Sequence, residues 1–144
     1  MTTSRRTLFS TLLGFLISSL FVGCGQQPEA KVDVSAQIAG LKSPDKDTRI
    51  NACVELAKAG PNAASAVPTL IPLLKDPDAE VRKLASYALY EIGAAAKAAI
   101  PAVREQLNDP DRYVAAQAIN TLRAIDPNAA DLKPPPNVMT GSKP

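Results

Sequence analysis

The side chains that could do chemistry in this chain are two cysteines and several aspartates in short turns, since the chain contains no histidine. Nucleophilic catalysis by serine or cysteine usually needs a neighbouring general base, most often histidine. The turn residues Asp76, Asp78 and Glu80, with their counterparts Asp109 and Asp111, could offer carboxylate oxygens to a hard cation. Turn and helix-cap roles explain the same carboxylates. We therefore predict no catalytic residue, no metal site, no cofactor and no enzymatic activity.

The first cysteine, Cys24, follows a segment with the layout of a secretory signal. Arg5 and Arg6 form a basic start, and an apolar run then extends over residues 8–22. The run is shorter than the roughly 20 apolar residues that a membrane-spanning helix needs. We therefore predict a signal peptide over residues 1–23, and the alternative is an uncleaved anchor helix.

Residues 21–24, with the sequence Phe-Val-Gly-Cys, resemble the lipobox of bacterial lipoproteins. This resemblance implies a diacylglycerol thioether on Cys24, cleavage directly before it and acylation of the new N-terminus. Residues 4–9 are also similar to a twin-arginine export signal, so both that route and general secretion stay open. The expected location is the cell envelope, as a membrane-anchored lipoprotein that faces the periplasm or the cell surface, in either the inner or the outer membrane.

The charge of the expected mature chain excludes one class of partner. The full chain has 16 basic and 14 acidic residues, and the signal peptide removes two of the basic ones, Arg5 and Arg6. A nucleic-acid-binding protein needs a basic surface that releases phosphate counterions. We therefore predict no nucleic-acid partner. With Cys24 lipidated, no internal disulfide can form, and we expect Cys53 to be a small half-buried packing residue rather than a reactive thiol.

A repeat with a period of 33 residues organises the rest of the chain. Its clearest marker is a proline-centred turn that recurs at residues 43–45, 76–78 and 109–111. Aliphatic residues keep the same interval, as in the columns Leu41/Leu74/Leu107, Ala52/Ala85/Ala118 and Leu56/Leu89/Leu122. A fixed period of this length indicates an array of stacked units.

Each unit is predicted to be a pair of helices. Val81, Ala85 and Ile92 lie on one face of a helix, and Gly93 follows where a helix C-terminus favours a left-handed residue. Residues 63–75 show the same period. The intervening turn contains a proline that cannot continue the first helix and an aspartate, Asp78, that can cap the second. No strand is predicted, because the sequence lacks the alternation of apolar and polar residues that is typical of strands.

These patterns predict an all-α fold, a short α-solenoid of about three helix pairs over residues 33–126. Two such helices cannot bury their apolar faces alone, so stacking of neighbours must form the core. Residues 24–32 are expected to be the lipidated N-terminus and a tether, and residues 127–144 a Pro-rich disordered tail. The expected pairs cover about residues 33–59, 62–93 and 95–126.

Residues 76–93 resemble HEAT repeats, in particular the short form found in phycobilisome-lyase-like proteins, and the resemblance extends over residues 33–126. HEAT repeats are known for a ladder in which an aspartate of the turn bonds an arginine early in the second helix. If each arginine bonds the aspartate of the next unit, the ladder consists of two pairs, Arg49 with Asp76 and Arg82 with Asp109.

The two outer positions of this ladder hold Ser43 and Ala115, where no neighbouring unit exists to pair with. Unpaired charges near the stack would lower its stability. The pattern therefore favours an array of three units, and unrelated variation of surface residues is the alternative.

The resemblance also implies a groove, because the second helices of HEAT stacks line the concave surface. A helical wheel places Lys83, Tyr87 and Tyr90 of the second unit away from the core, together with Ser86. Tyrosine and arginine often supply much of the binding energy at interfaces. We therefore predict an unidentified protein partner, with these binding residues: Lys83, Tyr87, Tyr90, Asn120 and Arg123.

The same positions of the first unit are apolar: Ile50, Cys53, Val54 and Ala57. They predict an apolar front end of the groove, unless the tether or an N-terminal helix covers Ile50 and Val54. The functional hypothesis is a lipid-anchored module for protein–protein interaction. The alternative, which follows from the sub-family resemblance, is an assembly factor or lyase-type protein that acts on a chromophore or cofactor.

We expect Cys24→Ala to leave the precursor unlipidated and uncleaved before residue 24, because the thiol both accepts the lipid and determines the cleavage site of a lipobox. Mass spectrometry of the protein purified from membranes measures this. An unmodified N-terminus at any other residue of the unsubstituted protein would contradict the lipoprotein hypothesis.

Overall fold

The computed structural model describes residues 32–128, and within this range every regular element is helical. The predicted signal peptide, the predicted lipidation site Cys24 and nearly all of the expected tether and tail lie outside the described residues. Each helix between residues 32 and 128 is too short or too polar to cross a lipid bilayer. The α-helices are α1 (Val34–Gly40), α2 (Lys46–Ala59), α3 (Val67–Leu73), α4 (Ala79–Ile92), α5 (Ile100–Glu105) and α6 (Arg112–Ile125).

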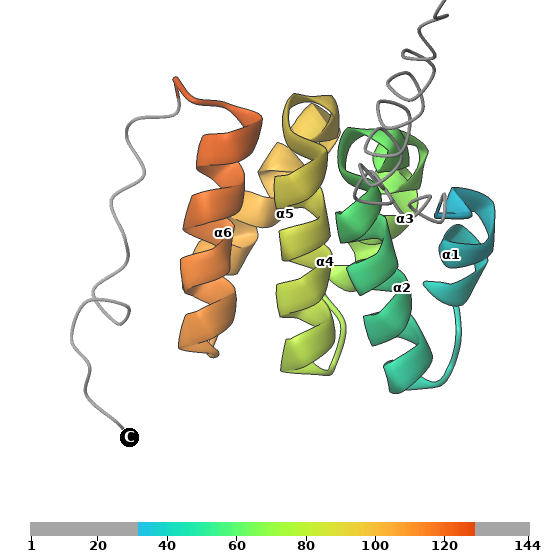
Figure 1. Ribbon diagram of the computed structural model, residues 1–144. Coiled ribbons are helices and arrows are strands. Elements are labelled where there is room, and N and C mark those ends of the chain that lie inside the picture. The colour runs from blue at the N-terminus through green and yellow to red at the C-terminus, as the bar shows by residue number, and fades with distance from the viewer. Residues whose placement is uncertain (1–31, 129–144) are drawn as a thin grey trace, which may run out of the picture. The chain divides into compact units, whose positions relative to one another are not determined.

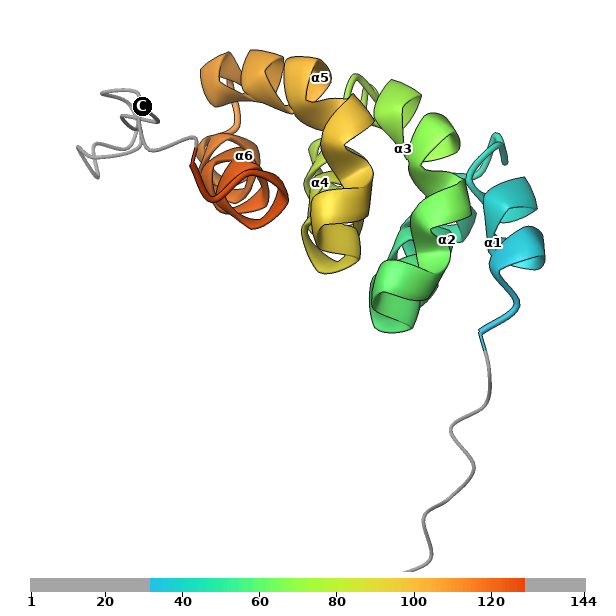
Figure 2. The ribbon, with the colours of Figure 1, turned by 90° about the horizontal axis from the view of Figure 1, so that it is seen from above.

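The helices form two layers. Figure 1 shows α2, α4 and α6 side by side in one layer, with α3 and α5 behind them and α1 at the N-terminal end. Seen from above, the array curves, and α2, α4 and α6 lie on its inner side (Figure 2). Fully buried aliphatic side chains such as Leu56, Leu89 and Leu122 pack between the layers. The prediction of an all-α array of stacked helix pairs is confirmed.

The inner helices α2, α4 and α6 begin at aspartates that cap them. Asp45 accepts a hydrogen bond from the Thr48 amide at 2.8 Å, and Asp78 accepts bonds from the amides of Glu80 and Val81. Asp111 caps α6 in the same way. Each cap satisfies amides that the helix itself leaves unpaired and contributes about 0.5–2 kcal/mol.

The outer helices differ from the continuous helix expected over residues 63–75. A 3-10 helix over Gly60–Ala66 comes first, and α3 begins only at Val67. The third unit repeats this with a 3-10 helix over Gly93–Ala99 before α5. A proline at the start of α3 and of α5 explains the break, because proline fits the first turn of an α-helix but not its interior.

Gly60 and Gly93 end α2 and α4 with positive φ angles of 54° and 66°. The expectation that Gly93 adopts the left-handed helical conformation is wrong, since its ψ angle is −137°. This combination is the mirror image of extended backbone and is open in practice only to glycine. The glycines therefore turn the chain sharply from an inner helix into the next outer segment.

Two buried ion pairs join successive units. Arg82 of α4 donates from Nε to Asp109 Oδ2 at 2.8 Å and from Nη2 to Asp109 Oδ1 at 3.0 Å. Arg49 of α2 pairs with Asp76, where Nη2 donates to Oδ1 at 3.2 Å and Nε lies 2.9 Å from Oδ2 without the geometry of a hydrogen bond. In each pair the arginine side chain is 13% exposed and the aspartate 8% exposed. The four residues Arg49, Asp76, Arg82 and Asp109 are called the ladder below.

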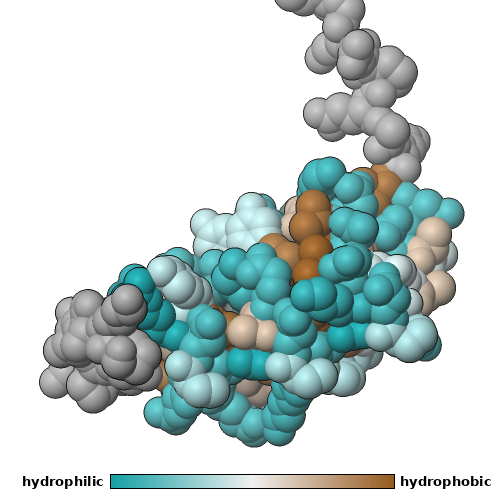
Figure 3. Space-filling model, turned by 90° about the horizontal axis from the view of Figure 1, so that it is seen from below, coloured by the Kyte–Doolittle hydropathy of each residue, from teal (hydrophilic) through white to brown (hydrophobic). Residues whose placement is uncertain are grey.

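Each ladder arginine also holds the turn of its own unit. Arg82 Nη1 donates to the carbonyl oxygens of Asp76 and Pro77, at 2.7 and 3.2 Å. The Asp109 carboxylate in turn accepts the Asp111 amide at 2.8 Å. One guanidinium thus fixes two successive turns, and its hydrogen bonds to Asp109 raise the pKa of Arg82. In Figure 3, the face that carries these turns is hydrophilic over most of its area, with a hydrophobic stripe toward one edge.

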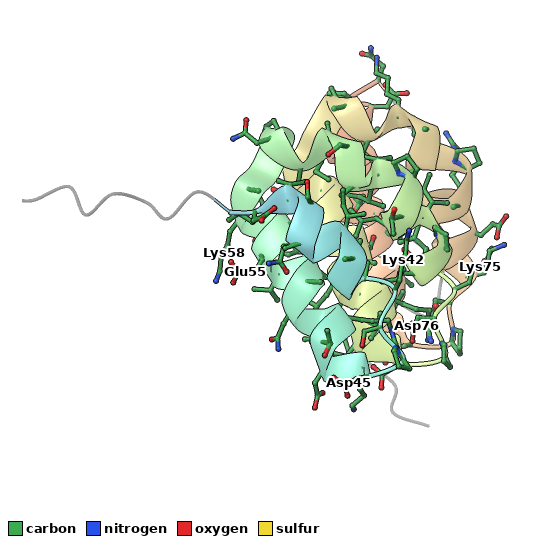
Figure 4. All side chains as sticks on the ribbon, turned by 90° about the vertical axis from the view of Figure 1, so that its right-hand side faces the viewer. Lys42, Asp45, Glu55, Lys58, Lys75 and Asp76 are labelled. Atoms are coloured by element: carbon green, nitrogen blue, oxygen red, sulfur yellow. The ribbon has the colours of Figure 1, made fainter. Side chains whose placement is uncertain are left out.

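In the first turn, an uncharged side chain accepts the amide hydrogen bond that an aspartate accepts in the later turns. Ser43 Oγ accepts the Asp45 amide at 3.1 Å, as Asp109 Oδ1 does for Asp111. Figure 4 shows Asp45 and Asp76, from successive turns, on the same side of the stack. A serine is sufficient in the first turn because no ladder arginine precedes it among the described residues.

Cys53 is fully buried, so the expectation of a half-buried residue is wrong. Cys53 belongs to the buried core cluster, and α4 packs against α2, an effect that a wheel for one helix cannot include. Burial, with a smaller contribution from the charge of Asp76, raises the pKa of the Cys53 thiol to about 12.

We expect Arg82→Ala to lower the free energy of unfolding by about 1.5–3 kcal/mol, the range for partly buried hydrogen bonds to charged groups. The matched control Arg123→Ala removes an exposed arginine outside the ladder and should cost about 0–1 kcal/mol. Urea unfolding measures both. A double-mutant cycle with Asp109→Ala gives the coupling, and additive effects would show that the two side chains do not interact.

We expect stability to fall more steeply above about pH 8.5 in the Cys24→Ala chain than in Cys24→Ala/Cys53→Ala. The folded thiol holds its proton more tightly than the unfolded one, whose pKa is about 8.5. Its contribution is therefore complete below about pH 8.5 and is lost as the pH rises toward 12. Urea unfolding across this range measures it. Equal pH dependence in the two chains, or rapid alkylation of folded Cys53, would contradict the assignment.

Candidate functional site

A groove of about 720 Å³ lies between the inner helices α4 and α6. The structure brings four of the five predicted binding residues to it. Lys83 lies outside, because its ammonium group pairs with Glu80 at 2.7 Å on the same face of α4. The lining residues are Tyr87, Tyr90, Glu91, Gln117, Asn120, Arg123 and Ala124.

One wall of the groove is a stacked pair of tyrosines on α4. The ring centroids of Tyr87 and Tyr90 are 6.0 Å apart and the ring planes differ by 14°. Their spacing of three residues places both rings on the same face of the helix. The side chains are 38% and 39% exposed, although tyrosine is a large and mostly apolar residue. The pair thus offers an aromatic surface to a ligand.

Glu91 influences the protonation of the Tyr87 hydroxyl group on this wall. As a hydrogen-bond acceptor and as a negative charge, the Glu91 carboxylate raises the pKa of Tyr87. The Tyr87 hydroxyl therefore stays protonated over the physiological range and remains a hydrogen-bond donor.

The opposite wall comes from α6 and is polar. Gln117 and Asn120 present amide groups, and Arg123 presents a guanidinium in the last turn of the helix. Arg123 and Asn120 are exposed, and Gln117 is half-buried. The groove therefore has an aromatic side and a side rich in N–H donors.

A buried polar contact beneath the groove joins its two walls. Ser86 Oγ of α4 lies 3.1 Å from Thr121 Oγ1 of α6, and Thr121 Oγ1 lies 2.9 Å from the Ser86 carbonyl oxygen. Both side chains are fully buried. The expectation that Ser86 faces the groove is wrong, because the neighbouring inner helix covers this edge of α4. The contact helps to set the spacing of α4 and α6, and so the width of the groove.

The first unit gives this surface a different character. Ile50 and Val54 are half-buried, whereas Cys53 and Ala57 are buried, so the expectation that these last two line the groove is wrong. Glu55 and Lys58 form an ion pair at 2.6 Å and project together from α2 (Figure 4). The α2 end of the inner surface is thus a mixture of apolar and charged groups.

Glu91, Gln117 and Ala124 line the groove but were not predicted from the sequence. Gln117 precedes Asn120 by three residues, and Ala124 follows it by four, so all three lie on one helix face. Extending the wheel of α6 by one turn in each direction would have found them. Glu91 adjoins Tyr90 in sequence, and only the arrangement of α4 and α6 shows that it reaches the groove.

Within residues 32–128, the structure contains no group of three or more histidine, cysteine, aspartate or glutamate side chains that could hold a metal ion. The turn carboxylates of Asp76 and Asp109 instead bind the ladder arginines.

No protein of curated function matches this chain. The sequence profile of one family, described as HEAT repeats, matches residues 34–123, which is more than half of the chain. The chain therefore belongs to the HEAT-repeat family.

Proposed function

We propose that this chain is a lipid-anchored interaction module of the cell envelope that binds a protein partner in the groove between α4 and α6. HEAT repeats as a family suggest a scaffold for protein interaction. The observation that carries the proposal is the exposed, stacked pair Tyr87 and Tyr90 opposite Asn120 and Arg123.

The groove has the composition of an interface that can bind tightly. Tyrosine and arginine are enriched among the residues that dominate binding energy, particularly where they lie in a depression that excludes water. The described residues include three large hydrophobic side chains that are exposed, Tyr87, Tyr90 and Tyr113, and two of them line the groove. This concentration favours a partner at the groove over one elsewhere on the described surface.

The lipid anchor and the envelope location rest on the sequence. The lipobox-like residues 21–24 precede α1 by only a short segment, so a lipid on Cys24 would hold the array close to the membrane surface. We infer that the contact with the membrane runs through the lipid alone. An anchored module meets its partner at the membrane surface, where tethering raises the effective concentration of both.

We expect Tyr87→Ala/Tyr90→Ala to abolish the contact with a specific partner, because the substitutions remove the aromatic wall. The matched control is Tyr113→Ala, which removes the third exposed tyrosine from outside the groove. Proximity labelling in the native host, with the label fused to the full lipidated chain, measures the loss. The proposal requires that proteins labelled by the unsubstituted chain and by Tyr113→Ala disappear with the double variant.

Identical labelling in all three chains would contradict a binding role for the groove. Circular dichroism must show that the double variant keeps its helix content. A visible absorption band in the purified, unsubstituted chain would instead favour the assembly-factor alternative, in which the ligand is a chromophore.

A further inference from the structure

The groove between α4 and α6 is unusual in the balance of its hydrogen-bonding groups. Tyr90 can donate its O–H, Asn120 its NH₂ and Arg123 its guanidinium N–H groups to a ligand, whereas the Tyr87 O–H faces Glu91 and the Gln117 NH₂ lies 3.4 Å from Thr121 Oγ1. The one carboxylate is that of Glu91, which is engaged with the Tyr87 hydroxyl. The groove therefore suits a ligand that supplies hydrogen-bond acceptors and has few donors of its own that need an acceptor from the protein.

A proline-rich segment in the polyproline II conformation has these properties. Its backbone makes no internal hydrogen bonds, so its carbonyl oxygens are free to accept. Proline has no amide hydrogen and so makes no demand for an acceptor. Its pyrrolidine ring packs on aromatic side chains, and aromatic-lined grooves are the usual receptors for such segments. The near-parallel rings of Tyr87 and Tyr90 offer a surface of this kind.

We infer that the occupant is a segment of this same chain, residues 133–137, which contain Pro134, Pro135 and Pro136. These three are the longest run of prolines in the sequence, and they lie outside the described residues.

The connection is long enough for this segment to reach the groove. The last described residue is Asn128, and Arg123 and Ala124 of the groove belong to the final turns of α6 just before it. The six residues from 128 to 134 span at most about 20 Å when extended. Packed helices have axes about 8–10 Å apart, so the tyrosines of α4 lie within reach.

Connectivity favours the same occupant. A connection of only a few residues gives the segment an effective concentration of the order of millimolar, so contacts of millimolar affinity are enough to occupy the groove. A protein partner must then displace the segment, which would make binding at the groove competitive. The inference deepens the proposed function at the same site.

The experiment uses the full chain with Cys24→Ala and Tyr113→Phe, which leaves Tyr87 and Tyr90 as the emitting tyrosines because the chain has no tryptophan. In this background, Pro134→Ala/Pro135→Ala/Pro136→Ala should increase the quenching of tyrosine emission by acrylamide. It should also shift the side-chain amide resonances of Gln117 and Asn120. The matched control, Pro144→Ala, changes a proline outside the segment and should shift neither.

Addition in trans separates docking from indirect effects. A synthetic peptide of residues 131–139 should restore the protection of the triple variant at concentrations of the order of millimolar. The same peptide with alanine at the three proline positions should not. Tyr90→Ala in the chain with intact prolines should reproduce the amide shifts of the triple variant, because it removes part of the receptor.

Three results would overturn the inference. One is equal quenching in the triple variant, in Pro144→Ala and in the background chain. Another is protection that disappears on dilution, which would assign the segment to a second copy of the chain. The third is equal protection by the proline and alanine peptides. These measurements need no partner protein, so a groove shown to be open leaves the proposed partner binding intact, and loss of that partner leaves the docking result intact.

Discussion

The guanidinium forks of Arg49 and Arg82 are the contacts on which the arrangement of the array depends. Each fork binds a carboxylate of the following unit through two nitrogens and the turn of its own unit through the third. A bidentate contact of this kind fixes direction as well as distance, which a lysine at the same position could not do. The rotation of one unit relative to the next is therefore determined at the turns, although the apolar area is buried along the helices.

This constraint explains why the core can consist of small residues. Ala52, Ala85, Ala88 and Ala118 are buried on the inner helices, where they allow close approach but supply little shape to define a register. A buried ion pair adds little net stability when both partners are present, yet the loss of one partner is costly. The pairs thus penalise misaligned stacking, while alanine and leucine burial supplies the attraction. The alignment of the units also affects the geometry of the groove, because α4 carries both Arg82 and, about one to two turns later, the tyrosine pair.

The features that the sequence predicts correctly are those that depend on one helix or one turn. The 33-residue period locates the units, and the caps at Asp45, Asp78 and Asp111 follow from local chemistry. The outward direction of Tyr87 and Tyr90 follows from helix geometry alone.

The errors arise where a second element decides the outcome. Cys53 and Ser86 lie at the edge of the outward face of their helices, and the neighbouring inner helix covers that edge. Lys83 is an exception, because it pairs with Glu80 on its own helix and does not line the groove. Gly93 ends its helix as expected, but its ψ angle depends on the direction of the next segment, which begins as a 3-10 helix. Neither a helical wheel nor an intrinsic helix propensity takes these contacts into account.

Different positions of the repeat face the neighbouring units and the groove. The columns that face a neighbouring unit lose their special residue at the ends, with Ser43 before the ladder, Ala115 after it and Asp126 in the column of Gly60 and Gly93. The groove column instead changes at every unit, from Val54 to Tyr87 to Asn120. Substitution in this column leaves the ladder untouched, because its side chains point away from the turns and the core. A repeat protein of this kind can therefore acquire a new ligand without a change in the contacts that hold its units together.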